Sequence, residues 1–259
     1  MPDKPPRMEA SSAGAEAEPS TGLPAYVGTS GWAYASWKPE FYPAKLAQKK
    51  FLEYYATQMN SVEVNFTFRQ LPTASTVANW LAATAAGFRF SFKAPQQITH
   101  IRRLKDCADQ LEGLALSLAH VVRAGRMGVV LFQLPPNFKA DVARLAAFLS
   151  GANRFGLRLA FEFRHSSWFA DEVVDVLRQH QAALCVAEGD ALETPDVTTA
   201  AFACYRLRKS DYSPAELHAI VQTLRTRAEQ GDVFAYFKHE EQPGGALRAV
   251  ETLQRLRQG

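Results

Sequence analysis

The order of apolar and polar positions divides the chain into two kinds of segment that alternate from residue 26 onward. Short runs rich in Val, Phe, Tyr and Leu, bounded by Gly, Pro, Asp or Asn, are typical of buried β-strands. Between most of these runs, apolar residues recur at three- and four-residue spacing, which indicates amphipathic helices. The pattern predicts eight strands, at residues 26–32, 61–68, 88–95, 128–135, 158–165, 182–190, 202–209 and 232–240.

The same pattern predicts seven helices, and one of them carries a clear start signal. Ser213 precedes Pro214 and Glu216 follows closely, as in helices that begin at a capping serine. Residues 191–200, between the sixth and seventh strands, have the composition of a loop instead. The predicted helices cover residues 46–58, 75–85, 108–125, 141–152, 171–181, 213–230 and 245–258.

This alternation fits the typical span of a TIM barrel, about 250 residues. An open doubly wound sheet would show the same alternation, but no G-x-G-x-x-G follows the first strand and no G-x-x-x-x-G-K-[ST] occurs. Closure of the sheet also removes exposed strand edges. We therefore predict an α/β fold, a closed (β/α)8 TIM-type barrel in which the helix between strands six and seven is missing or reduced.

The first 24 residues differ in composition from the rest of the chain. They are rich in Pro, Ala, Ser, Gly and Glu, contain almost no large apolar residues, and carry a net charge of −2. Such a segment cannot bury enough apolar surface to offset the entropy lost on ordering. We expect residues 1–24 to form a disordered N-terminal tail and residues 25–259 to form a single barrel domain.

The overall composition is that of an ordinary globular protein, with 47% hydrophobic residues and a formal net charge of +3. No apolar run approaches the roughly 20 residues of a membrane-spanning helix, and the N-terminus lacks a signal-peptide pattern. Cys107, Cys185 and Cys204 are widely spaced, which argues against a disulfide framework or a thiolate zinc site. We expect a cytoplasmic protein without membrane contact, whose oligomeric state stays open.

Alternation within the strands predicts that polar side chains point into the barrel. In the second strand, Glu63, Asn65 and Thr67 alternate with apolar residues that must pack under the helices. The third and fifth strands place Lys93 and Glu162 on the same inner face. Charges buried there cost several kcal/mol each unless they are paired or hydrated.

The two inward glutamates allow both structural and chemical interpretations. Glu63 lies early in its strand, where a salt bridge to Arg89 or another cation and a functional role stay open as alternatives. Glu63 and Glu162 come from strands three apart and face one another across the barrel. Paired carboxylates can hydrolyse glycosides, but the depth of Glu63 and the cationic surroundings do not favour that reaction.

Cations outnumber carboxylates at the C-terminal ends of the predicted strands, where the active sites of TIM barrels lie. Arg164 and Arg208 carry guanidinium forks suited to phosphate or carboxylate, although Arg208 and Lys209 would equally fit an exposed basic turn. This pattern predicts a pocket for a small anionic ligand. The residues placed near this rim are Asn65, Thr67, Lys93, Gln133, Arg164, His165, Arg208 and Lys238.

Several motifs together resemble a known family: VGTSGWAYASW, SVEVNFTF, FKAPQQITH, LFQLPP, FEFRHSSWF, YRLRKSDYS and YFKHE. They are similar to the YecE-like family, catalogued as domain of unknown function 72, over residues 26–257. The resemblance implies a TIM-type (β/α)8 barrel and brings no established reaction. This chain has Lys238-His239-Glu240 where many relatives have Asn-Asn-Asp. Positions that match the family's motifs include Gly28, Thr29, Ser30, Gly31, Trp32, Glu63, Asn65, Lys93, Thr99, His100, Gln133, Glu162, Arg164, His165 and Trp168.

The first functional hypothesis is an enzyme that acts on a small anionic substrate, phosphorylated or nucleotide-like, by metal-independent acid–base chemistry. Lys93 could alternatively form a Schiff base if burial lowered its pKa, and His100 could shuttle protons. The roles we assign are acid or base for Glu162 or His165, charge clamping for Lys93 and Arg164, and orientation of polar groups for Asn65 and Gln133.

Two other classes of function compete with this hypothesis. A nucleic-acid-binding or processing protein would use the basic rim, with Trp32 and Trp168 as stacking surfaces. A module that binds a ligand without chemistry would use the same pocket. Whether the protein is an enzyme therefore stays open at this stage.

A metal site is the minority interpretation of the strand ends, and we predict neither a metal nor a cofactor. The strand ends contain no H-x-H or H-E-x-x-H motif, and nearby Lys and Arg side chains would compete with a metal cation for the carboxylates. The metal-ligand types available there are Glu162, His165, Glu188, Asp190, His239 and Glu240.

Overall fold

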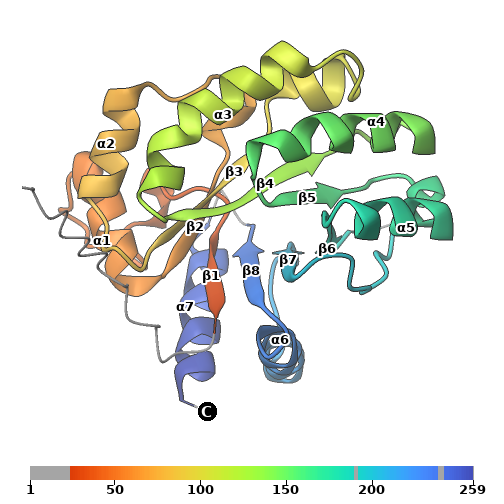
Figure 1. The fold of residues 1–259 in the computed structure, drawn as a ribbon. Helices are drawn as coiled ribbons and strands as arrows, with labels where there is room; N and C mark the ends of the chain where they lie inside the picture. Colours follow the sequence, from red (N-terminus) through yellow and green to blue (C-terminus); the bar gives the residue numbers. More distant parts are fainter. Residues whose placement is uncertain (1–23, 190–191, 239–241, 259) are drawn as a thin grey trace, which may run out of the picture.

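The computed structural model describes residues 24–189, 192–238 and 242–258. The predicted tail up to residue 23, Asp190, and the segment that departs from the family pattern at His239 and Glu240 lie outside these residues. Within them, eight parallel strands form a sheet that closes almost completely into a barrel, with helices around it (Figure 1). The predicted TIM-type (β/α)8 fold is confirmed.

The strands follow one another around the barrel in the order β1-β8-β7-β6-β5-β4-β3-β2, and each pair is parallel. This is the arrangement in which every strand is followed by a crossover connection outside the barrel. The strands are β1 (Ala25–Thr29), β2 (Ser61–Val64), β3 (Arg89–Lys93), β4 (Met127–Gln133), β5 (Leu159–Glu162), β6 (Ala183–Ala187), β7 (Phe202–Leu207) and β8 (Asp232–Phe237).

All seven predicted helices are present, and in the described part of the chain no helix joins β6 to β7, as predicted. The predicted helix start is also confirmed, because Ser213 and Glu216 form a reciprocal capping box at the start of α6. The helices are α1 (Phe51–Gln58), α2 (Ala74–Ala82), α3 (Ala108–Arg123), α4 (Val142–Ala152), α5 (Asp171–Gln179), α6 (Pro214–Ala228) and α7 (Gly244–Arg257).

The barrel closes between β1 and β2 with the help of side chains. The two strands are linked by an isolated parallel bridge between Ser30 and Glu63. Below it, the Asn60 amide donates to the Ala25 carbonyl and accepts from the Val27 amide, each at 2.8 Å. These bonds satisfy backbone groups that a full ladder would otherwise pair.

Gly28 is required at this seam because the two strands approach closely. A Cβ at this position would lie 1.9 Å from the carbonyl oxygen of Ser61 and 2.7 Å from the Tyr55 hydroxyl. The structure uses Gly28 for strand packing, and Gly31 adopts a φ of 91° that suits glycine.

The predicted strand 61–68 is shorter than expected, which corrects the assignment of Thr67 to the barrel interior. Strand β2 ends at Val64 because Asn65 adopts a helical conformation, and Phe66–Phe68 form a 3-10 turn. The Thr67 hydroxyl donates to the carbonyl of Lys93 at 2.6 Å. Thr67 therefore fastens this turn to β3 and does not face a ligand.

The barrel interior has two halves of different character. The half at the N-terminal ends of the strands, called the lower interior here, is mainly apolar, and the rings of Tyr26 and Phe234 stack in it with centroids 5.0 Å apart. The expectation of a polar interior therefore holds for the upper interior alone. The lower interior comprises Tyr26, Val129, Leu131, Ala160, Ala183, Cys185, Ala200, Phe202, Cys204, Phe234 and Tyr236. The upper interior comprises Ser30, Glu63, Lys93, Gln133, Glu162 and Arg206.

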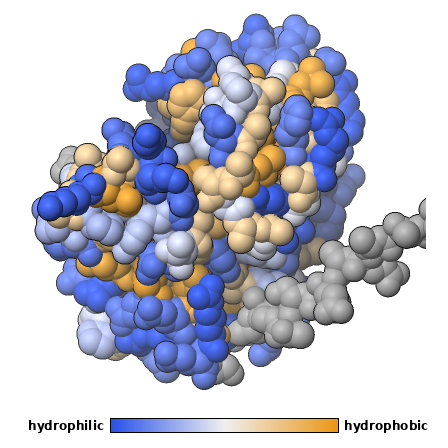
Figure 2. All heavy atoms as spheres, turned by 90° about the vertical axis from the view of Figure 1, so that its left-hand side faces the viewer, coloured by the Kyte–Doolittle hydropathy of each residue, from blue (hydrophilic) through white to orange (hydrophobic). Residues whose placement is uncertain are grey.

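The outer surface is mixed in character. Figure 2 shows one face on which hydrophilic residues predominate and apolar residues gather in smaller patches between them. None of the helices described is both long enough and apolar enough to cross a membrane.

Candidate functional site

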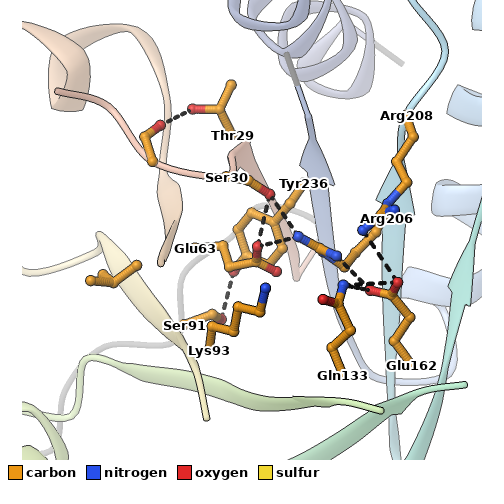
Figure 3. Close-up of polar contacts among 12 residues, drawn as sticks. Thr29, Ser30, Glu63, Ser91, Lys93, Gln133, Glu162, Arg206, Arg208 and Tyr236 are labelled. Atoms are coloured by element: carbon orange, nitrogen blue, oxygen red, sulfur yellow. Dashed lines mark hydrogen bonds and ion pairs between the residues drawn. The ribbon is translucent and has the colours of Figure 1, made fainter. Parts of the chain in front are cut away.

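A buried arginine, Arg206 of β7, occupies the centre of the upper interior (Figure 3). Its guanidinium pairs with Glu63 at 2.8 Å and with Glu162 at 2.5 Å, and its side chain is 1% exposed. Burial by itself would lower the pKa of Arg206, but the two carboxylates raise it above its ordinary value. The two glutamates that face one another across the barrel are therefore bridged by one permanent cation.

Glu162 is surrounded by donors. Gln133 Nε2 lies 2.9 Å from both of its oxygens, and Arg164 and Arg208 approach within 3.1 and 3.2 Å. Burial by itself would raise the pKa of Glu162, but Arg206, followed by Arg208 and Arg164, holds it well below its ordinary value. Glu162 is therefore a fixed negative charge and a poor proton acceptor near neutral pH.

Glu63 forms the salt bridge that the sequence left open, and its partner is Arg206 rather than Arg89. It accepts hydrogen bonds from Ser30 Oγ at 2.7 Å and from Arg206 at 2.8 Å. Arg89, the cation named from the sequence, donates instead to backbone carbonyls in the turn before β3. With Arg206 between Glu63 and Glu162, the pair does not form the open carboxylate cleft that glycoside hydrolysis requires.

A hollow of about 500 Å³ opens directly above this network, at the C-terminal ends of the strands. Of the described residues that line it, five are Lys or Arg and none is Asp or Glu. Two phenylalanine rings form an apolar part of the wall. The lining residues are Asn65, Phe66, Phe68, Arg69, Gln70, Lys93, Gln133, Arg206, Arg208 and Lys238.

Lys93 reaches this hollow from the end of β3. Its ammonium lies 4.3 Å from the centroid of the Phe68 ring, and it has no hydrogen-bond or ion-pair partner among the described residues. Burial, followed by the positive charge of Arg206, lowers the pKa of Lys93 to about 8. Lys93 is thus a group in this wall whose protonation changes near pH 8.

Asn65 supplies an unused acceptor at the same wall. Its Oδ1 is enclosed and accepts no hydrogen bond from any residue that the structure describes. A buried polar atom without a partner costs free energy, and a ligand donor or a water would relieve that cost. Gln133, the other amide predicted to orient a ligand, is occupied by Glu162 through its Nε2.

Arg208 belongs to the site, whereas its neighbour Lys209 does not. Arg208 lines the hollow and contacts Glu162, and its backbone amide donates to Glu188 at 2.6 Å. Lys209 is exposed and pairs with Glu216 at 2.7 Å. Arg208 therefore lies where a ligand-binding residue was expected, and Lys209 lies in an exposed basic turn. Lys238 also lines the hollow, as its position at the end of β8 predicted.

Neither histidine named from the sequence is among the described residues that line the hollow. His100 packs edge-on against Phe68, and its Nδ1 lies 2.9 Å from Thr99 Oγ1. Burial, followed by Lys93 and Arg164, lowers the pKa of His100. His165 accepts a hydrogen bond from the Ser167 amide through Nδ1, which fixes its ring at the start of a 3-10 turn.

Four further residues that match the family's motifs are not among the described residues that line the hollow. The Thr29 hydroxyl donates to the Gly31 carbonyl at 2.6 Å, and Ser30 is bound to Glu63. Trp32 is half-buried and packs edge-to-face on another indole. The expectation that Trp168 offers a stacking surface is wrong. Its side chain is 1% exposed, stacks on Phe163, and donates Nε1–H to a backbone carbonyl.

Of the metal-ligand types named from the sequence, the structure describes Glu162, His165 and Glu188, and these three do not form a metal-binding group. Within residues 24–189, 192–238 and 242–258, no group of three or more His, Cys, Asp or Glu side chains is placed to hold a metal ion. The two carboxylates of the upper interior instead share the guanidinium of Arg206, which takes the place that a metal cation would need.

Two residues central to the site were missed in the sequence, Arg206 and Phe68. Arg206 lies two positions before Arg208 on one strand, so the same alternation that selected Arg208 also points Arg206 inward. Arginine is seldom fully buried, so Arg206 was not expected in the barrel interior. Phe68 falls among the apolar positions of the strand predicted at 61–68, which face outward, and no pattern in the sequence indicates the 3-10 turn that it belongs to.

Comparison with known proteins identifies similar sequences in two bacteria. The UPF0759 protein YecE of Escherichia coli (strain K12) is 32% identical over 149 residues, which cover 56% of this chain and 50% of that protein. The UPF0759 protein YunF of Bacillus subtilis (strain 168) is 28% identical over 150 residues, which cover 56% and 52%. The matched part thus spans about half the length of each of these curated relatives.

Solved structures of DUF72 family proteins share the fold. One from Thermotoga maritima MSB8 superposes with a TM-score of 0.80 at 26% identity and covers 90% of this chain and 98% of that one. One from Enterococcus faecalis V583 has a TM-score of 0.72 at 16% identity. A family model described as "Protein of unknown function DUF72" matches residues 26–259. The chain therefore belongs to the YecE-like DUF72 family, as its motifs indicated.

Proposed function

We propose that this protein is an enzyme that binds a small anionic substrate in the hollow above Arg206 and acts on it by metal-independent acid–base chemistry. The observation that carries the proposal is the wall itself: five cationic side chains and no carboxylate among its described residues. A phosphate or carboxylate group would receive charge-assisted hydrogen bonds there, which are about twice as strong as neutral ones.

The network below the hollow supports this function because it fixes the charges in place. Glu162 holds Arg208, and Arg206 neutralises Glu63 and Glu162, so the site keeps its positive potential without a costly rearrangement on binding. The side chains that contact the ligand are Lys93 and Arg208, with Asn65 as an acceptor for a ligand donor. Arg164, proposed from the sequence as a clamp, serves instead to hold Glu162.

The sequence favoured Glu162 or His165 as the acid or base, and the proposal gives this role to a different residue. Glu162 is held as an anion. The His165 ring accepts a hydrogen bond from the Ser167 amide within the 3-10 turn that follows β5. Lys93 changes protonation near neutral pH and faces the hollow, with His100 behind the Phe68 ring. We therefore assign the acid–base role to Lys93, and a supporting role to His100.

The nucleic-acid alternative loses one of its two stacking surfaces, because Trp168 is enclosed in the core. The non-catalytic alternative uses the same hollow, and turnover separates it from the proposal. A panel of phosphorylated and carboxylated metabolites should contain a compound that the wild type converts and Lys93→Met does not. Binding without turnover across such a panel would favour a module that only binds.

Anion binding is tested with a pair of adjacent arginine and lysine variants. Titration calorimetry with inorganic phosphate and pyrophosphate would compare Arg208→Gln with Lys209→Gln, which remove equal charge one residue apart. Loss of a charged hydrogen bond weakens binding by about tenfold or more, so Arg208→Gln should weaken binding to that extent. Lys209→Gln should retain wild-type affinity. Equal effects, or no binding by the wild type, would refute the anion site.

A further inference from the structure

The Lys93 amine is placed differently from lysines that hold ion pairs on the surface. Lys50 and Lys209 bond to carboxylates at 2.6 and 2.7 Å. Lys93 instead lies against the Phe68 ring, with no hydrogen-bond or ion-pair partner in the described part of the chain. Figure 3 shows its side chain rising from β3 into the interior, on the side of Glu63.

Burial, followed by the positive charge of Arg206, favours the neutral form of this amine, against the attraction of Glu63 and Glu162. The two carboxylates nearby are already engaged by Arg206, so neither is bonded to Lys93. With its pKa lowered to about 8, roughly a tenth of the Lys93 side chains are uncharged at neutral pH, against less than about 0.1% for an ordinary lysine. A neutral amine is the nucleophilic form.

The hollow also provides a place for a negatively charged group next to this amine. Arg208 and Lys93 both line the same space of about 500 Å³, which suits a small molecule. An anionic group held at Arg208 would leave the rest of the ligand beside Lys93. Asn65 Oδ1, enclosed and without a partner among the described residues, could accept a hydrogen bond from a ligand hydroxyl.

We propose that Lys93 forms an imine with a small aldehyde or ketone that carries a carboxylate or phosphate group. This inference rests on the anion site of the proposed function and adds the substrate's reacting group. In the step, the neutral Lys93 nitrogen attacks the carbonyl carbon, and one of its two protons passes to the carbonyl oxygen. The resulting carbinolamine then loses its hydroxyl group, together with the remaining nitrogen proton, as one water molecule.

The test traps the imine by reduction in the whole protein. The wild type is incubated with pyruvate or with dihydroxyacetone phosphate and sodium cyanoborohydride, which delivers the hydride that converts the imine to a stable secondary amine. Peptide mapping by mass spectrometry then locates the adduct. We expect one adduct per chain, on Lys93, with at least one of the two compounds, and none with acetone, which lacks an anionic group.

Two variants separate a specific reaction from general labelling of lysines. Lys93→Arg keeps the positive charge but cannot form an imine, and it should abolish the adduct. Lys209→Arg removes an exposed amine with a carboxylate partner and should leave the adduct unchanged. Adducts spread over exposed lysines, with none enriched on Lys93, would overturn the inference, as would trapping that persists in Lys93→Arg.

Phosphate titration of the same wild-type sample distinguishes this inference from the proposed function. Phosphate binding that depends on Arg208, without any adduct on Lys93, refutes imine formation and leaves the anion site intact. Absence of both phosphate binding and the adduct refutes both. An adduct that forms equally well with acetone and with the anionic compounds refutes the role given to the anion site.

Discussion

The lower and upper halves of the barrel interior are filled by different kinds of side chain. In the lower interior, Tyr26 and Phe234 stack among small apolar residues, so stability there comes from removing apolar surface from water. In the upper interior, Arg206 joins Glu63 and Glu162, so stability depends on complete pairing of buried charges. The upper half therefore responds to charge and pH, and the lower half responds to volume.

The largest effect should follow from removing Arg206. Arg206→Met leaves Glu63 and Glu162 buried without their shared cation, which should lower the free energy of unfolding by about 3–5 kcal/mol. Urea denaturation at neutral pH measures this change. Arg178→Met is the matched control, because Arg178 pairs with Asp175 at the exposed surface and should change stability by less than about 0.5 kcal/mol. Similar effects of the two variants would contradict the account.

Glu162→Gln should have the next largest effect, about 2–3 kcal/mol at neutral pH, because three arginines lose their carboxylate partner. The pKa of Glu162 is lowered in the folded state from an ordinary value of 4.5. Its contribution is therefore complete above pH 4.5 and declines as the pH falls below that value.

Acid titration of stability sharpens the contrast between the two halves. As the pH falls below 4.5, the difference between the wild type and Glu162→Gln should shrink. Phe234→Leu in the lower interior should instead cost about 1–2 kcal/mol at every pH, because it removes packed volume and no charge. Parallel profiles for both variants would show that the upper half has no special dependence on pH.

Tyr236→Phe tests the boundary between the halves. The Tyr236 hydroxyl donates to Ser91 Oγ at 2.6 Å and lies 2.8 Å from Ser61 Oγ. Its removal leaves both serines with fewer partners and should cost about 1–2 kcal/mol. Thermal unfolding measures the loss, with Tyr26→Phe as a control at the other end of the lower interior. A loss no larger than that of the control would contradict the importance of this hydroxyl cluster.

Lys93→Met should give the smallest effect, and it should be stabilising. Because the pKa of Lys93 is lowered to about 8 when folded, from 10.5, folding is penalised below pH 8 and the penalty disappears as the pH rises through 10.5. Allowing for solvent screening, the variant should gain about 1 kcal/mol near neutral pH. Urea denaturation across this pH range should show the gain fading at alkaline pH. A destabilised variant at neutral pH would be the opposite result.

The sequence predicted the barrel because the outward faces of its strands follow simple rules. Alternation of apolar residues located all eight strands, and Ser213 with Glu216 located the start of α6. Strand ends were less predictable. The strand expected to reach Phe68 stops at Val64. The turn that follows is bonded through Thr67 to the Lys93 carbonyl, 26 residues away, and the local sequence does not indicate that contact.

The candidate site was predicted in part. Alternation brought Lys93, Glu162 and Arg208 correctly to one end of the barrel, because side-chain direction follows from position in a strand. It did not show which charges would pair with one another, so the bridging role of Arg206 and the enclosure of Trp168 were missed. Pairing and burial depend on packing between distant segments, which one sequence without structure does not reveal.

The most direct test of the central claim is an NMR titration of the Lys93 side chain, with and without phosphate. The account predicts a pKa near 8 in the free protein. Adding phosphate should raise this pKa, because a bound anion beside the ammonium favours its charged form. A pKa near 10.5 that phosphate does not change would contradict both the burial of Lys93 beside Arg206 and the use of the hollow as an anion site.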